Sequence, residues 1–294
     1  MRVLVTGANG FLGGAIRKRL AARSDLALVG GAGRLDDPVA LAEGLRTARP
    51  DIVVHAAGRT TGSADDFQAD NVVATDNLAR AIDAATPDCG LILLSSAAQY
   101  GHSADRTPWK ETGPCNPVDD YGASKLAAEA AAFAATRRVA ALRLFNVIAP
   151  GAQGEQAFSS FLRKLVAAMA GPPPWRVEMG RLSAVRDFTA LDDALSAVER
   201  AIERDAWGEA INVCTGVGRP VRALLDEVGR LVAPEGRGAL VISESGSPPV
   251  LDWSIGDPAL CQARLGFTPA DDLSALVRQA ADWVRLMAEA RANA

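Results

Sequence analysis

The chain has 294 residues, with 31 lysines and arginines against 35 aspartates and glutamates and a formal net charge of −4. This length suits one large α/β domain or such a domain with a smaller lobe, and without a basic stripe or an apolar run of ~20 residues we expect no nucleic-acid or membrane partner. The two histidines and the cysteines lack metal-ligand spacing, so we expect no metal. The cysteines Cys89, Cys115, Cys214 and Cys261 form no CxxC pair, so we expect reduced thiols and a cytoplasmic location.

Short apolar runs alternate with helical patterns along much of the chain. The first helical pattern covers residues 15–22, and the apolar runs predict strands at 3–5, 26–29, 51–55, 91–94, 140–144 and 210–213. Several of these runs lack polar alternation, which is typical of parallel strands covered on both faces. The repetition of strand, helix and strand therefore predicts an α/β fold with a Rossmann-type, doubly wound parallel sheet.

The pattern loosens after residue 150, where a loop at 151–154 and then a run of three prolines interrupt it. We therefore expect a dinucleotide-binding domain at residues 1–150, to which residues 186–215 return with a helix and a strand. The other residues, 151–185 and 216–294, are expected to form a smaller C-terminal substrate-binding lobe that ends in a terminal helix.

A glycine-rich loop follows the first predicted strand and opens the first helix. Gly7 allows the tight turn, Gly10 lets backbone N–H groups approach a pyrophosphate, and Gly13 lets the helix pack close to the sheet. The N-terminus of the helix adds a dipole that favours phosphate. The loop therefore predicts a nicotinamide-dinucleotide site, and its other expected cofactor contacts are Asn9, Phe11 and Leu12.

The end of the second predicted strand bears on which dinucleotide is bound. An acid there would hydrogen-bond a ribose 2′-hydroxyl, but residues 29–34 contain none. Arg34 could pair with a 2′-phosphate through its planar guanidinium, or it could simply be solvated. Asp37 before Pro38 is typical of a helix N-cap instead. We therefore expect NAD(P) with a lean towards NADP, contacted by Arg34 and Leu35.

Tyr121 and Lys125 lie four residues apart at the start of a predicted helix, so their side chains share a face. A lysine cation favours a phenolate, which predicts a pKa of Tyr121 lowered from its reference of ~10 towards neutrality. Such a tyrosine can donate a proton to a carbonyl, or take one from an alcohol, as hydride moves at the nicotinamide. Ser95 and Ser96 end a predicted strand, where ligands of parallel sheets bind.

Together these motifs resemble the extended short-chain dehydrogenase/reductase family, which includes the nucleotide-sugar epimerases, dehydratases and reductases. The resemblance covers nearly the whole chain, and the matching segments are Thr6–Gly13, Val54–Gly58, Ser95–Gly101, Tyr121–Lys125, Arg143–Asn146, Arg186–Thr189 and Asn212–Gly216. It implies the catalytic residues Ser96, Tyr121 and Lys125, the last two also touching the cofactor. It implies a cofactor cleft lined by Ala56, Ala57, Gly58, Asn71, Ser95 and Phe145. It also implies substrate contacts, including those to a nucleotide-sugar diphosphate, from Ser96, Asn146 and Arg186.

The residues after Ser96 bear on the branch of this family. Ala97 and Ala98 stand where 4,6-dehydratases carry an Asp–Glu pair, and Ala98 stands where the fucose-synthase branch carries a cysteine, so neither activity is expected. Residues 143–151 and 180–189 resemble the GDP-4-keto-6-deoxy-mannose reductases. Two readings remain: reduction of the 4-keto group of a nucleotide-linked 6-deoxyhexose, and nucleotide-sugar 4-epimerisation. The loop at 244–249 lacks the arginine usual in those reductases, which leaves a smaller carbonyl substrate open.

A third reading is a non-catalytic, cofactor-sensing regulator, which some members of the resembling family have become. Such members typically lose the tyrosine or the lysine, and this chain keeps both Tyr121 and Lys125, which favours an enzyme. The alanine-rich helix after Tyr121 is expected either to form a homodimer contact, as the resemblance suggests, or to pack under the sheet. His55, at the end of a buried strand, is expected to be a hydrogen-bonded core residue.

Overall fold

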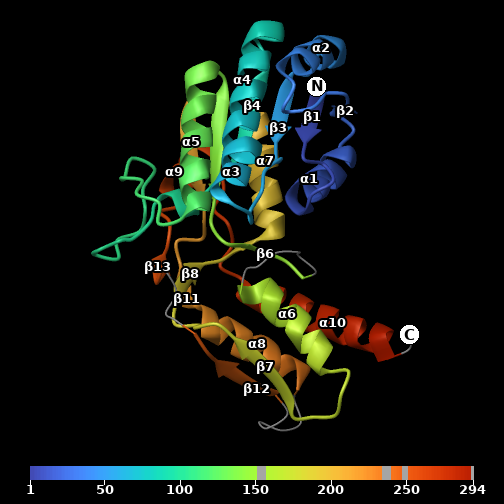
Figure 1. The fold of residues 1–294 in the computed structure, drawn as a ribbon, viewed down its shortest axis with the longest axis vertical. Coiled ribbons are helices and arrows are strands. Elements are labelled where there is room, and N and C mark those ends of the chain that lie inside the picture. Colours follow the sequence, from blue (N-terminus) through green and yellow to red (C-terminus); the bar gives the residue numbers. More distant parts are fainter. Residues whose placement is uncertain (151–156, 234–239, 247–250, 293–294) are drawn as a thin grey trace.

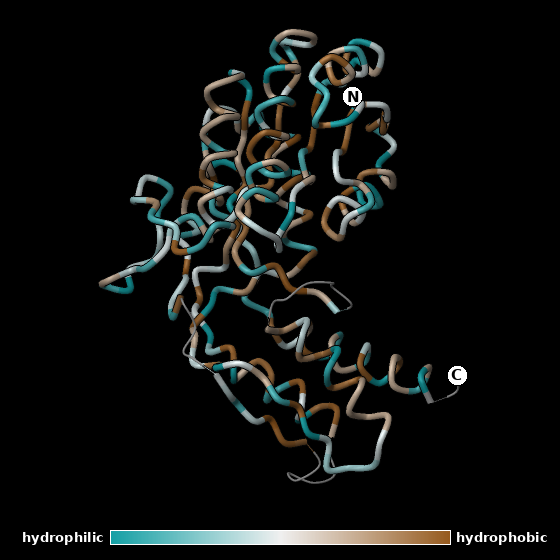
Figure 2. The backbone as a smooth tube through the Cα atoms, viewed as in Figure 1, coloured by the Kyte–Doolittle hydropathy of each residue, from teal (hydrophilic) through white to brown (hydrophobic). Residues whose placement is uncertain are grey.

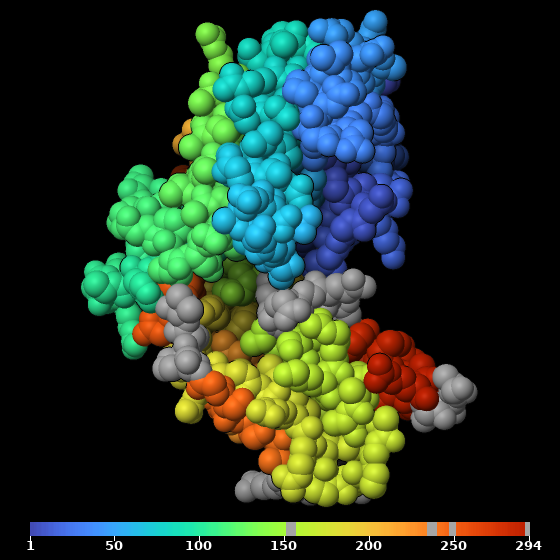
Figure 3. Space-filling view, viewed as in Figure 1, coloured from blue at the N-terminus to red at the C-terminus, as the bar shows by residue number. Residues whose placement is uncertain are grey.

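The computed structural model describes residues 1–150, 157–233, 240–246 and 251–292. Figure 1 shows two lobes, with the N-terminus in the upper one and the C-terminal helix in the smaller, lower one. The space-filling view shows the surface hollowed between the two lobes (Figure 3). The loop expected at 151–154, and the last three residues of the loop at 244–249, lie outside the described residues.

A six-stranded sheet forms the centre of the upper lobe, in the order β10-β5-β4-β3-β1-β2. All neighbouring pairs are parallel. The strands are β1 (Arg2–Thr6), β2 (Ala27–Val29), β3 (Ile52–His55), β4 (Gly90–Ser96), β5 (Val139–Leu144) and β10 (Glu209–Val213). The chain steps from β1 to β2 on one side and then to β3 on the other, so the order reverses between β1 and β3. The predicted doubly wound α/β fold is therefore confirmed.

Helices cover both faces of the sheet because successive strand side chains point to opposite sides. Leu4 and its neighbour Val3 are both buried, yet they belong to different apolar cores. The core around Leu4 includes α2 (Pro38–Ala48), α4 (Ala74–Ala85) and α5 (Asp120–Ala135). The core around Val3 includes α1 (Phe11–Ala21), α7 (Leu191–Arg204) and α9 (Ala259–Leu265). Figure 2 shows brown, apolar stretches of chain within the upper lobe and also in the lower one.

The smaller lobe has an apolar core of its own, filled by side chains such as Phe161, Leu165 and Leu225. Its helices are α6 (Ala157–Ala168), α8 (Val221–Val232) and α10 (Leu273–Ala292). One two-stranded sheet pairs β7 (Trp175–Met179) with β12 (Leu240–Glu244). At the junction of the lobes, the short strands are β6 (Val147–Ile148), β8 (Val185–Asp187), β9 (Thr189–Ala190), β11 (Gly218–Pro220) and β13 (Trp253–Ser254). The short helix α3 (Ala64–Phe67) belongs to the upper lobe.

Two expectations change when they are compared with the structure. Helix α1 begins at Phe11, four residues before the predicted start, because Gly10 is an extended N-cap. Helix α9 lies within residues 216–294, expected in the smaller lobe, yet its Cys261 and Leu265 are completely buried in a core of the main sheet. That expectation is therefore wrong for α9, whose apolar side packs with α7 and β10. The remaining domain boundaries stay a prediction. Among the described residues, no helix is both long and apolar enough to cross a membrane.

Candidate active site

The glycine loop joins β1 to α1 at the carboxyl edge of the sheet. Gly7 has φ +66°, and a Cβ added there would lie 2.5 Å from the backbone nitrogen of Ala57. A Cβ added to Gly13 would lie 2.1 Å from the carbonyl oxygen of Gly7. Gly10 precedes α1, and no side chain in the described part of the chain caps the helix there. The first N–H groups of α1 are thus free to meet a pyrophosphate, so the loop fits a dinucleotide cofactor.

Arg34 and Leu35 lie in the loop between β2 and α2. The Arg34 guanidinium donates two hydrogen bonds to the Asp36 carboxylate, at 2.9 and 2.6 Å, and both side chains are exposed. The Leu35 carbonyl oxygen accepts a hydrogen bond of 3.0 Å from Asn77. The guanidinium predicted to bind a 2′-phosphate is therefore paired with a carboxylate, which a phosphate would have to displace. Exposed pairs of this kind contribute little stability, so the exchange is feasible.

The start of α5 is held close to the end of β4. Asp119 caps the helix by accepting a hydrogen bond of 2.7 Å from the N–H of Gly122. A Cβ added to Gly122 would lie only 2.6 Å from the carbonyl oxygen of Ala98, which follows β4. The cap fixes where the helix begins, and the close approach brings its first turn, with Tyr121, beside Ser96.

Ser96, Tyr121 and Lys125 meet at this point. The Tyr121 hydroxyl lies near that of Ser96, which favours the ionised form of Tyr121, and Ser96 Oγ accepts from the N–H of Ala98 at 3.2 Å. Lys125 Nζ donates to the carbonyl oxygen of Leu94 at 2.6 Å. The structure therefore brings together two hydroxyls and an ammonium group at the carboxyl end of β4, where parallel sheets bind their ligands.

Burial sets the charge states of these groups. It raises the pKa of Tyr121 above the ordinary value, Ser96 opposes this through its hydrogen bond, and Asp119 adds to it. Burial lowers the pKa of Lys125 to about 8, against the opposite effect of Glu129. The predicted lowering of the Tyr121 pKa is therefore wrong for the protein by itself. The reason is that Tyr121 loses hydration while the Lys125 ammonium is engaged by a backbone carbonyl.

Asn71 lies in a π-helical segment, Gln68–Val73, immediately before α4. Its Oδ1 accepts from the N–H of Arg59 at 2.7 Å, and its Nδ2 donates to Ser124 Oγ at 2.9 Å. A Cβ added to Gly58 would lie 2.9 Å from that same Oδ1. Asn71 thus ties the loop after β3, which is expected to line the cofactor cleft, to the first turns of α5.

His55 is a core residue, as the sequence predicts. It is 1% exposed, and its Nδ1 and Nε2 lie 2.6 and 3.1 Å from the hydroxyl oxygens of Thr6 and Thr75. Burial, aided by the nearby Lys125, lowers the pKa of His55 to about 3, so the ring is neutral at physiological pH. Among the described residues, no three His, Cys, Asp or Glu side chains gather into a group that could hold a metal.

Asn146 and Arg186 lie at the junction of the lobes. Asn146 has φ +22° and donates from Nδ2 to the carbonyl oxygen of Asp187 at 2.8 Å. Arg186 donates to the carbonyl oxygens of Val185 at 3.0 Å and Leu251 at 2.5 Å. Burial lowers the pKa of Arg186. Both residues expected to bind a diphosphate are thus near each other in the fold, and each also holds backbone of the junction.

Residues 3–214 match the NAD dependent epimerase/dehydratase family. The chain belongs to this family. The dTDP-6-deoxy-L-talose 4-dehydrogenase (NAD(P)(+)) of Kitasatospora kifunensis is 32% identical over 95% of this chain and 94% of its own. The GDP-6-deoxy-D-mannose reductase of Pseudomonas aeruginosa is 32% identical over 76% of this chain and 78% of its own. The structure of RMD from Pseudomonas aeruginosa complexed with NADPH has a TM-score of 0.84 at 28% identity and covers 99% of both chains.

In this epimerase/dehydratase family member, two residues expected at the cofactor cleft turn their side chains inward. Ser95 is 4% exposed, and its hydroxyl donates to Glu129 at 2.7 Å. Phe145 is fully buried in a small core with Tyr100 and Cys214. Any contact of Ser95 or Phe145 with a cofactor is therefore limited to backbone atoms. The remaining cofactor and substrate assignments stay predictions.

Sequence reasoning missed three charged residues that organise the site of this family member. Glu129 and Arg143 form a buried ion pair behind Ser96. Asp187 is completely buried, and its carboxylate accepts from the N–H groups of Thr215 and Gly216, both at 2.9 Å. The spacing of Glu129, four residues after Lys125 on the same helix face, is the signal that could have found it. Nothing local in the sequence marks Asp187, because its partners come from a loop nearly thirty residues away.

Proposed function

We propose that this protein is an NAD(P)-dependent oxidoreductase that reduces the 4-keto group of a nucleotide-linked 6-deoxyhexose. The observation that carries the proposal is the meeting of Ser96, Tyr121 and Lys125 at the end of β4, with alanine at both positions after Ser96. Elimination of water needs an acid there, and reduction does not. Two relatives named for 6-deoxy sugars linked to dTDP and GDP support the substrate class.

The chemistry follows from these three side chains. A reduced nicotinamide dinucleotide held by the glycine loop would supply the hydride for the carbonyl carbon. Ser96 and Tyr121 present hydroxyls to the carbonyl oxygen, and Tyr121 donates its proton as negative charge develops on that oxygen. The Lys125 ammonium stabilises the resulting phenolate. Burial keeps Tyr121 protonated at neutral pH, which is the state that the reductive direction requires.

The proposed cofactor residues lie in the upper lobe, and the proposed substrate residues lie at the junction of the lobes. The glycine loop would hold the pyrophosphate of the cofactor, and Arg34 would bind a 2′-phosphate after exchanging it for Asp36. A structural relative complexed with NADPH supports this lean towards NADP. Asn146 and Arg186, an amide and a guanidinium, suit the diphosphate of a nucleotide sugar.

The test is to mix the purified protein with NADPH or NADH and with dTDP- or GDP-linked 4-keto-6-deoxyhexoses. We expect reduced cofactor to be consumed in step with formation of the 4-hydroxy sugar. Interconversion of C4 epimers without net consumption would make the protein an epimerase instead. Cofactor binding with neither reaction would make it a regulator.

The variant Tyr121→Phe tests the proton donor within this proposal. General acid catalysis typically contributes 10²–10⁴-fold, so we expect turnover to fall by at least roughly 100-fold. The dissociation constant of NADPH should change little, because the ring remains and only the hydroxyl is lost. Turnover equal to that of the wild type would remove Tyr121 from the mechanism.

We also propose a homodimer formed through α5, and a cytoplasmic location, which the free thiols of all four cysteines support. The exposed residues of α5 include a stripe of small side chains at Ala123, Ala127, Ala130 and Ala134. Such a stripe lets the helix of a second copy approach closely. Sedimentation analysis should show a dimer, and Ala130→Arg should yield a monomer. A wild-type monomer at micromolar concentration would contradict the proposal.

A further inference from the structure

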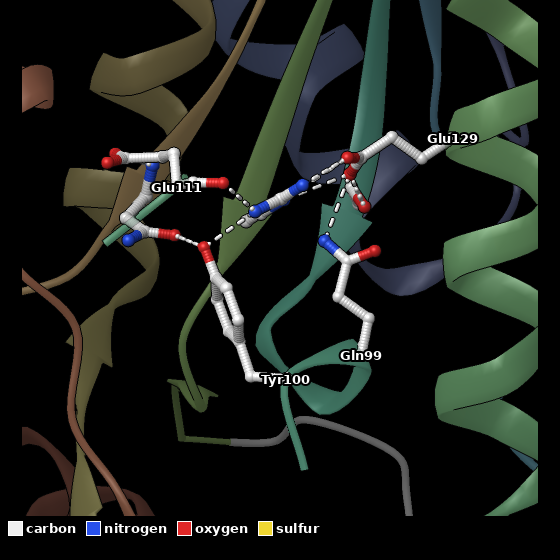
Figure 4. Close-up of polar contacts among 7 residues, drawn as sticks. Gln99, Tyr100, Glu111 and Glu129 are labelled. Carbon is white, nitrogen blue, oxygen red and sulfur yellow. Dashed lines mark hydrogen bonds and ion pairs between the residues drawn. The ribbon is translucent and has the colours of Figure 1, made fainter. Parts of the chain in front are cut away.

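A buried charged network joins Glu129 to Gln99 and, through Arg143, to Tyr100 (Figure 4). The same carboxylate accepts from Ser95, the residue before Ser96. The Glu129 carboxylate accepts from Arg143 at 2.5 Å, from the Ser95 hydroxyl at 2.7 Å and from Gln99 Nε2 at 3.0 Å. The side chains of Arg143 and Glu129 are only 8% and 6% exposed. Arg143 donates further to the Tyr100 hydroxyl, at 2.7 Å. The pair is thus fixed from several strands and loops at once.

Helix α5 holds the end of β4 through three successive turns of one face. Tyr121 lies next to Ser96, Lys125 donates to the carbonyl oxygen of Leu94, and Glu129 accepts from the hydroxyl of Ser95. These three partners are consecutive residues of β4. Glu129 therefore belongs to the same contact between α5 and the end of β4 as Tyr121 and Lys125, and its own side chain is buried.

The charge of Glu129 also acts on Lys125. The titratable groups that face Lys125 are Tyr121 and Glu129 from α5, His55 from β3 and, beyond Glu129, Arg143 from β5. His55 is neutral because its pKa lies at about 3, and burial keeps Tyr121 neutral. Of these groups only Glu129 is negative, and it opposes the burial that lowers the pKa of Lys125. The Glu129 carboxylate thus favours the charged form of Lys125.

We propose that Glu129, anchored by Arg143, is a positioning residue of the reductase site, which fixes Ser96 through Ser95 and keeps Lys125 charged. The inference rests on the proposed function for its catalytic meaning. The effect of Glu129 on the pKa of Lys125, however, can be measured without any substrate. Removing the carboxylate while Arg143 stays leaves an unopposed cation near Lys125. We therefore expect the Lys125 pKa to fall and the position of Ser96 to be less well fixed.

The experiment titrates Lys125 directly. The chain has only four lysines, Lys18, Lys110, Lys125 and Lys164, so lysine labelled with a carbon isotope at the ε-carbon gives four NMR signals, and Lys125→Arg assigns one of them. We expect Glu129→Gln to move the midpoint of Lys125 downward by at least about one pH unit, as a charge one helical turn away should. Glu111→Gln is the matched control, since Glu111 bonds the N–H of Asn212 in the same network and should leave the midpoint unchanged.

Two further variants keep the test decisive. Glu129→Gln leaves Arg143 buried and unpaired, and if that variant does not fold, Glu129→Gln with Arg143→Met removes both charges together. We expect the Lys125 midpoint of the double variant to lie below that of the wild type but above that of Glu129→Gln. Glu129→Asp retains the charge but not the reach to Ser95, so it should keep the midpoint and lose turnover. A Lys125 midpoint equal to that of the wild type in the double variant overturns the proposal.

Kinetics then separate this inference from the proposed function. If the wild-type protein reduces a nucleotide sugar, Glu129→Gln should lower kcat/KM roughly tenfold at neutral pH, and the alkaline limb of the profile should move down with the Lys125 midpoint. If the wild type shows no reduction, the proposed function fails, whereas the lysine titration still decides whether Glu129 supports Lys125. Ser95→Ala should lower kcat without moving the midpoint.

Discussion

The glycine loop offers a sharp test because adjacent glycines of α1 differ in the space around them. A Cβ on Gly13 would lie 2.1 Å from the carbonyl oxygen of Gly7, whereas a Cβ on Gly14 would lie 3.3 Å from that of Ala8. Alanine at Gly13 therefore forces backbone apart by on the order of 1 Å, at a cost of about 1–3 kcal/mol. At either position it also gains up to about 1 kcal/mol of helix propensity.

We expect Gly13→Ala to weaken NADPH binding by at least roughly tenfold, because the displaced loop loses hydrogen bonds to the pyrophosphate that are worth about 1.5–3 kcal/mol each. Gly14→Ala should bind NADPH like the wild type and unfold at equal or higher urea concentration. Fluorescence titration with NADPH and urea unfolding of the three proteins measure both quantities. If Gly13→Ala binds NADPH as tightly as Gly14→Ala does, the reasoning from close packing is refuted.

Three further predictions follow from charges and buried hydrogen bonds. The pKa of Lys125 is about 8, and the lysine is charged below that pH. We therefore expect kcat/KM for reduction to be flat near neutrality and to fall as pH rises through about 8. A profile that is still flat at pH 9 would contradict this. Arg34→Ala should weaken NADPH binding and leave NADH binding almost unchanged, whereas Asp36→Asn should strengthen NADPH binding. Equal effects on both cofactors in competition titrations would rule out a 2′-phosphate contact. Asp187→Ala should lower the free energy of unfolding by about 1–3 kcal/mol, measured by urea, because the buried N–H of Thr215 loses its acceptor; an unchanged midpoint would show that water replaces the carboxylate.

Local patterns were enough to predict the sheet and the loop. Strands such as β3 and β5 are buried along their whole length, so they appear in the sequence as unbroken apolar runs. Gly7 and Gly13 are read correctly because each is needed by a contact within a few residues or with the adjacent strand. Asp37 caps α2 as its position before a proline indicates.

What the sequence did not reveal depends on contacts between distant segments. The pKa of Tyr121 depends on how deeply the ring is buried, and spacing along the helix shows only that Lys125 shares its face. The role of Glu129 requires Arg143 from another strand, and that of Arg34 requires knowing that Asp36 has turned towards it. The place of α9 is set by the complementary surface of α7, which no periodicity in α9 itself can show.

The path of the chain between the lobes has a consequence for folding during synthesis. The main sheet receives its edge strand β10 only at Glu209–Val213, and the cover from α9 arrives only at Ala259–Leu265. Between β10 and α9 in the sequence, the ribosome synthesises α8 and β12, which belong to the smaller lobe. A nascent chain ending before α9 leaves apolar surface of α7 and β10 uncovered, so the first half cannot mature ahead of the second. The two lobes are therefore completed almost together, once α9 and α10 have been synthesised, and neither can be cut out of the chain as a continuous, independently folding piece.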